Sequence, residues 1–94
     1  MIASDITKRV RNDFNRPDDA RLVLSVLEDF QKQNPDLSSD RFIRCLVQVA
    51  DGDLGRLDQA IELAVVDFRD LIVWAEYDEN RLQIRDLSKP IASR

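Results

Sequence analysis

Acidic and aromatic side chains alternate between residues 67 and 78, and these are the residue types closest to a chemical site. Asp67 and Asp70 are three residues apart, so on a helix they share one side with Trp74, which follows one turn later. Two carboxylates on one side of a helix are the start of a site for a divalent metal that activates water. An exposed aromatic ring among acids is instead typical of an interface anchor. Because no other helix offers a matching acidic row, we predict an interface here and expect both carboxylates to pair with arginines.

Other catalytic classes find little support in the chain. There is no histidine among the 94 residues, which removes the usual general base and the commonest metal ligand. Two glycines are too few for a loop that cradles phosphate. Asp51, Gly52 and Asp53 resemble the start of a calcium loop, but Arg56 stands at the position where that loop needs glycine. We therefore predict no catalytic residue, no cofactor and no metal site.

Cys45 is the single cysteine, and its neighbours predict that it is buried. It shares the apolar side of a helix with Phe42, Leu46 and Val49, where a thiol behaves as a small hydrophobic group with a raised pKa. One cysteine cannot form an intramolecular disulfide, and the first residues lack the apolar core of a secretory signal. No apolar stretch approaches the ~20 residues that a membrane span needs. We expect a cytoplasmic protein with no membrane contact.

The spacing of apolar residues predicts four helices that position these side chains. Their expected bounds are about residues 2–14, 18–33, 39–51 and 54–77, followed by a tail over residues 78–94. Gly52 is expected to end the third helix in a left-handed conformation and Asp53 to cap the fourth, so that the two helices form a hairpin. The third helix is expected to turn its polar residues to water: Asp40, Arg41, Arg44 and Gln48. For residues 81–87 the pattern leaves a short strand and a tail open.

The fold class predicted is all-α: a compact four-helix domain built on one long C-terminal helix, with a short extended tail. The long helix is apolar on two sides, because a second row lies about 180° from the seam of Leu57, Ala64 and Leu71. A helix of this kind needs two packing partners, and the rest of the chain has little left to cover the second row. We predict a homodimer whose interface includes Leu63, Val66, Asp67, Asp70, Val73, Trp74, Tyr77 and Asp78.

Charge is divided unevenly along the chain, whose net charge is −4. Residues 54–80 hold two arginines against seven acids, a net charge of −5, whereas residues 1–16 carry +2 and residues 81–94 carry +3. Basic ends of this kind are expected to fold back along the acidic helix or to pair with it in a second copy. Phosphates repel an acidic helix, so we expect no nucleic-acid partner.

Three short segments carry a resemblance to a known group. The chain reads Ala50-Asp51-Gly52-Asp53-Leu54, then Asp67-Phe68-Arg69-Asp70 and Ala75-Glu76-Tyr77. This pattern resembles that of a group of short, uncharacterised bacterial proteins, in which a tyrosine is expected at the position of Phe68. The resemblance implies a helical, cytoplasmic bacterial protein and carries over no activity.

These observations lead to three hypotheses about function. The leading one is a non-enzymatic protein–protein interaction module that self-associates through the long helix. The alternative is a small acidic binder of a basic protein, in the manner of an immunity protein or an antitoxin. A more distant alternative is a metal-dependent enzyme that uses Asp67 and Asp70.

Overall fold

The structure, a computed structural model, describes residues 2–91 and is all-helical over that range. Its α-helices are α1 (Ser4–Asp13), α2 (Pro17–Gln33), α3 (Asp40–Ala50), α4 (Leu54–Val66) and α5 (Phe68–Glu76), and a short 3₁₀ helix, η1 (Pro35–Leu37), precedes α3. The predicted all-α class is confirmed. The last three residues of the predicted tail, 92–94, lie outside the described range.

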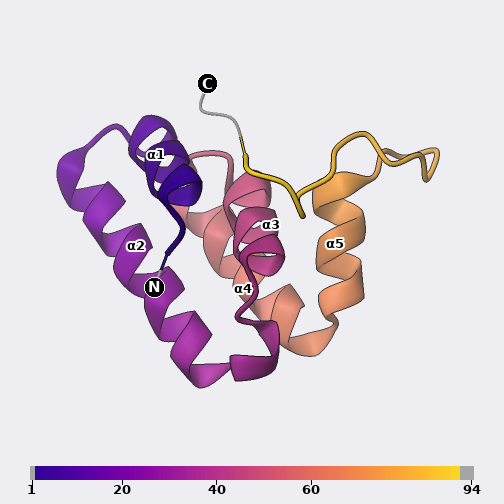
Figure 1. The fold of residues 1–94 in the computed structure, drawn as a ribbon, viewed down its shortest axis with the longest axis horizontal. Helices are drawn as coiled ribbons and strands as arrows, with labels where there is room; N and C mark the ends of the chain where they lie inside the picture. The colour runs from indigo at the N-terminus through magenta and orange to yellow at the C-terminus, as the bar shows by residue number, and fades with distance from the viewer. Residues whose placement is uncertain (1, 92–94) are drawn as a thin grey trace.

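Helix α3 lies at the centre of the molecule. Figure 1 shows α1 and α2 on one side of it, α5 on the other, and α4 behind it. Three of its apolar side chains, Ile43, Leu46 and Val47, have no exposed surface. Neighbours on several sides bury most of this helix, including a charged side chain, Arg44, and an unbroken run of buried residues extends from Ile43 to Val47. The long C-terminal helix was expected to hold this central place.

The helix boundaries on the N-terminal side follow local signals. Pro17 occupies the first turn of α2, where a missing N–H costs nothing, and Asp18 and Asp19 follow it at the positive end of the helix dipole. Asn34 ends the same helix one residue before Pro35. These bounds agree with the predicted second helix within a residue.

The turn between α3 and α4 has the predicted chemistry. Asp51 and Gly52 both have positive φ angles, 47° and 81°. Asp53 then caps α4, its carboxylate accepting a hydrogen bond from the backbone N–H of Arg56 at 3.1 Å. A Cβ atom on Gly52 would lie 2.8 Å from the carbonyl oxygen of Asp13, so the end of α1 rests directly on this turn. The hairpin prediction is confirmed.

The predicted single helix over residues 54–77 is wrong, because the chain bends at Asp67. This residue is extended, with φ −154° and ψ 98°, and its carboxylate accepts from the backbone N–H of Arg69 at 3.0 Å. A short acidic side chain that bonds the backbone locally competes with helix continuation and caps α5 instead. The bend also brings Phe68 edge-on against Phe42 of α3, with ring centroids 5.5 Å apart. A straight helix of that length would be about 35 Å long and would carry α5 past the end of α3.

The chain after α5 returns across α3 towards α1 (Figure 1). Within the described residues it forms no named strand, and a single antiparallel bridge joins Tyr77 to Gln83. Leu87 and Ile91 are buried in the core. Residues 77–91, which we call the C-terminal segment, are therefore held to the core at Leu87 and Ile91, whereas residues 79–84 are exposed.

We expect Gly52→Val to lower the free energy of unfolding by about 2 kcal/mol or more, since the new side chain meets both a positive φ and the Asp13 carbonyl. Urea unfolding followed by circular dichroism measures the change. Gly52→Asn separates the two causes, because asparagine tolerates a positive φ but still places a Cβ against Asp13. An unchanged unfolding midpoint in Gly52→Val would contradict this account of the turn.

Candidate functional site

The bend at Asp67 divides the predicted interface between α4, α5 and the residues that follow. Val66, Val73 and Trp74 remain 84%, 50% and 43% exposed. Leu63 and Tyr77 are half-buried. Val73 and Trp74 lie three and four residues after Asp70, so one side of α5 carries an acid followed by two apolar groups.

We call this set the outer α4–α5 surface, defined by its apolar and acidic members: Leu63, Val66, Asp67, Asp70, Val73, Trp74 and Tyr77.

Arg56 holds the indole of Trp74 in place. Its guanidinium carbon lies 5.9 Å from the centroid of the Trp74 ring, within the range of a cation–π contact. The same guanidinium donates to the backbone carbonyl of Val49 at 3.0 Å, which anchors it to the end of α3. Trp74 is therefore a partly exposed aromatic ring in contact with the start of α4.

The three acids of the predicted interface, Asp67, Asp70 and Asp78, each stabilise local backbone structure. Asp67 caps α5, and Asp78 accepts from the backbone N–H groups of Asn80 and Leu82 at 2.8 and 3.0 Å, which shapes the turn after Tyr77. Asp70 is exposed in the first turn of α5, where a negative charge suits the helix dipole.

The expected pairing of Asp67 and Asp70 with arginines is not found. In the described part of the chain, the ion pairs join Arg9 to Asp13, Arg21 to Asp18, Arg41 to Glu76 and Arg44 to Asp5. Nor do residues 2–91 contain a cluster of three or more metal-ligating side chains that could hold an ion.

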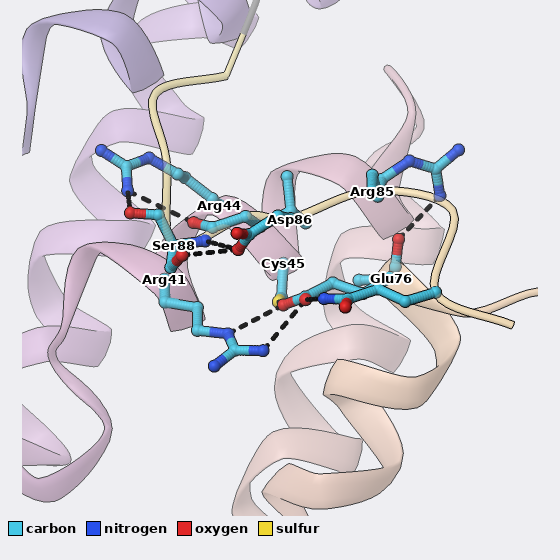
Figure 2. A network of polar contacts seen from close by, with 10 residues as sticks. Arg41, Arg44, Cys45, Glu76, Arg85, Asp86 and Ser88 are labelled. Atoms are coloured by element: carbon cyan, nitrogen blue, oxygen red, sulfur yellow. Dashed lines mark hydrogen bonds and ion pairs between the residues drawn. The ribbon is translucent and has the colours of Figure 1, made fainter.

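A buried polar centre that the sequence did not predict lies between α3, α5 and the C-terminal segment (Figure 2). Glu76 has no exposed surface. Arg41 donates to both of its carboxylate oxygens at 2.9 Å, and Gln83 donates to Oε1 at 2.9 Å. A carboxylate tolerates such burial only when charge and hydrogen bonds compensate its lost hydration. The arrangement therefore locks α5 and the C-terminal segment onto α3.

Cys45 contacts the same carboxylate, with its sulfur 3.7 Å from Oε2 of Glu76. Burial raises the pKa of the thiol to about 12, and the negative charge of Glu76 adds to the effect. The predicted burial and raised pKa are confirmed. A protonated thiol inside the core is a poor nucleophile, so this cluster serves packing.

A second polar contact ties three parts of the chain together. Arg44 was expected on the surface but is only 6% exposed. Its Nε and Nη2 atoms donate to the two carboxylate oxygens of Asp5 of α1 at 3.0 and 3.3 Å. It also donates to the carbonyl oxygens of Leu87 and Ser88 at 3.2 Å. The backbone N–H of Ile91 donates to Asp5 at 2.9 Å.

Opposing effects set the acidity of Asp5. Burial alone would raise its pKa, but the hydrogen bond from Arg44 and the N–H of Ile91 together outweigh burial and leave the pKa below its ordinary value. The charged form of Asp5 is therefore the form that stabilises the fold.

Position along the helices carried a weak signal for this polar centre. Glu76 follows Ile72 by four residues and Ala75 by one, so it lies on the inward side of α5. A charged residue on an apolar side predicts a buried partner, but the spacing does not say which arginine supplies it.

No protein-family model, curated protein or solved structure matches the chain. Within residues 2–91, no helix is both long and apolar enough to cross a lipid bilayer. The features that bear on function are thus the outer α4–α5 surface and the buried polar centre behind it.

We expect Arg41→Met to lower the free energy of unfolding by about 3 kcal/mol, because it leaves the Glu76 carboxylate buried without its countercharge. Arg21→Met is the matched control: its ion pair with Asp18 is 3.4 Å long between side chains that are 78% and 94% exposed, so the loss should stay under about 1 kcal/mol. Adding Glu76→Gln to Arg41→Met should recover stability. Equal losses in the two arginine variants would contradict the role given to Arg41, whose side chain is 39% exposed, as the countercharge of the buried Glu76.

Asp5 should make stability depend on pH at the acid end. In the folded state the pKa of Asp5 is lower than its ordinary value of 3.8. The stability that ionised Asp5 contributes is therefore present above the pKa of the unfolded state, and it is lost as pH falls through the pKa of the folded state. Asp5→Asn should therefore be less stable than the wild type at neutral pH and lose less stability below pH ~4. Urea midpoints over that range test this, with Asp18→Asn, at an exposed carboxylate, expected to follow the wild type. Parallel profiles for Asp5→Asn and the wild type would refute it.

Proposed function

We propose that this protein is a non-enzymatic protein–protein interaction module that self-associates through the outer α4–α5 surface. The observation that carries the proposal is the exposure of Val66, Val73 and Trp74, at 84%, 50% and 43%, on two adjoining helices of one small domain. Exposed apolar side chains of this kind favour association, since each apolar Å² removed from water contributes about 25 cal/mol.

The state of Trp74 supports the proposal. Tryptophan is among the residues most enriched at the energetic centres of interfaces. Association usually costs the ordering of such side chains, but the contact with Arg56 already restricts this one. An ordered, partly exposed indole is therefore suited to binding with little additional loss of entropy.

The surroundings of the Glu76 carboxylate and the Cys45 thiol support a non-catalytic role. The buried carboxylate of Glu76 is neutralised by Arg41, and the thiol of Cys45 is kept protonated beside it. A protonated, buried thiol also suits the reducing cytoplasm, where we place the protein.

A second candidate function is the binding of a basic protein. It is favoured by the net charge of −5 on residues 54–80 and by the exposure of Asp67 and Asp70 on the same surface. Binding of that kind would weaken steeply with added salt, whereas self-association through Val66, Val73 and Trp74 would persist.

We expect Val66→Asp combined with Val73→Asp to abolish self-association, because each change places a charge where apolar surface is buried between copies. Light scattering over the micromolar range measures the mass, and far-UV circular dichroism checks that the variant is folded. Val65→Asp is the matched control: Val65 is 58% exposed on α4 and lines a hollow with Phe30 of α2. A monomeric wild type, or an unchanged mass in the double variant, would overturn the proposal.

A further inference from the structure

We propose that the outer α4–α5 surface of one copy docks into a groove between α1 and α2 of a second copy. This inference rests on the proposed function and adds to it the surface that receives Trp74.

The groove has an apolar floor and a basic rim. It encloses about 420 Å³ where the end of α1 meets the start of α2, and its lining includes Phe14, Pro17, Ala20, Leu24, Arg11 and Arg21. Phe14 and Ala20 are 4% and 5% exposed, so they form the floor. A volume of that size, apolar with a few polar groups at its edge, is ordinary for a binding site.

The rim is positively charged within an acidic protein. Arg11, Arg16 and Arg21 are all exposed at this corner, whereas the whole chain has a net charge of −4. Arg21 contacts Asp18 at 3.4 Å, but both side chains are so exposed that the pair is readily exchanged for another carboxylate. The charge of this corner therefore complements that of an acidic surface with an apolar centre.

The outer α4–α5 surface has the complementary chemistry. Trp74 offers a large apolar body, and Asp70 lies one helical turn before it on the same side of α5. Asp67 caps the start of the same helix. The indole matches the apolar floor and the carboxylates match the arginines. If the surface met its own copy across a two-fold axis instead, it would place Asp67 and Asp70 of both copies at one interface, where like charges repel.

The two halves of this contact lie on different sides of the molecule. Figure 1 shows α1 and α2 on one side of α3 and α5 on the other. Each copy can then receive one neighbour in its groove while its own α5 enters another. Contacts of this heterologous kind build chains or closed rings, so the mass should exceed that of a dimer as concentration rises.

A charge exchange tests the pairing. Arg11→Glu with Arg21→Glu reverses the groove, and Asp70→Arg reverses the outer surface. Each variant alone should associate at least about tenfold more weakly than the wild type in sedimentation velocity at low salt. An equimolar mixture of the two should regain association, because each variant then offers the other an opposite charge at both contacts.

Controls separate charge from folding. Asp36→Arg changes net charge as much as Asp70→Arg, but Asp36 is an exposed residue of η1 that belongs to neither the groove lining nor the outer α4–α5 surface, so it should leave association unchanged. Circular dichroism and melting curves confirm that each variant is folded.

The outcomes distinguish this inference from the proposed function. If Val66→Asp with Val73→Asp gives monomers but the groove reversal changes nothing, the groove is not the receiving surface, and self-association by another arrangement stands. If the two charge variants fail to regain association when mixed, the pairing is wrong. If the wild type is monomeric at every concentration, both proposals fail together.

Discussion

The salt bridge between Arg41 and Glu76 fixes the C-terminal half of the molecule. Glu76 has no exposed surface, and both of its oxygens accept from Arg41 at 2.9 Å. Because a lone buried charge is so costly, α5 is stable only where this arginine reaches it. The contact sets the direction in which α5 leaves the bend at Asp67. It thereby decides that Val73 and Trp74 face outwards while Leu71 and Ala75 face α3.

The parts of the fold that follow from local chemistry were predictable from the sequence. The turn at Gly52 and the cap at Asp53 depend on one backbone angle and one carboxylate, and both are found as expected. The bend at Asp67 was not predictable in this way, since neither glycine nor proline marks it and the apolar spacing continues through it. Its stabilising contact, Phe68 on Phe42, joins residues that only the folded chain brings together.

The candidate surface could be predicted from local sequence, whereas the polar centre depends on contacts between residues far apart in the chain. Helical periodicity placed Val66 and Val73 opposite the core seam, and Trp74 was predicted to be an exposed aromatic among acids; all three are exposed. Arg44 was expected in water because the spacing of apolar residues in α3 placed it outside the apolar side of that helix. Its partner, Asp5, lies 39 residues away, and that of Glu76 lies 35 residues away. Periodicity identifies which side of a helix a charge occupies, but it does not identify what meets it there.

The hydrogen bond from the N–H of Ile91 to Asp5 joins residues 86 positions apart. During synthesis, Asp5 and Arg44 are both added to the chain long before Ile91. Until then, α1 and α3 share an ion pair that lacks its last donor, and the apolar positions that Leu87 and Ile91 fill are open to water. The native fold is therefore completed after translation reaches the C-terminal segment, and a ribosome stalled before that point holds a chain with exposed core surface.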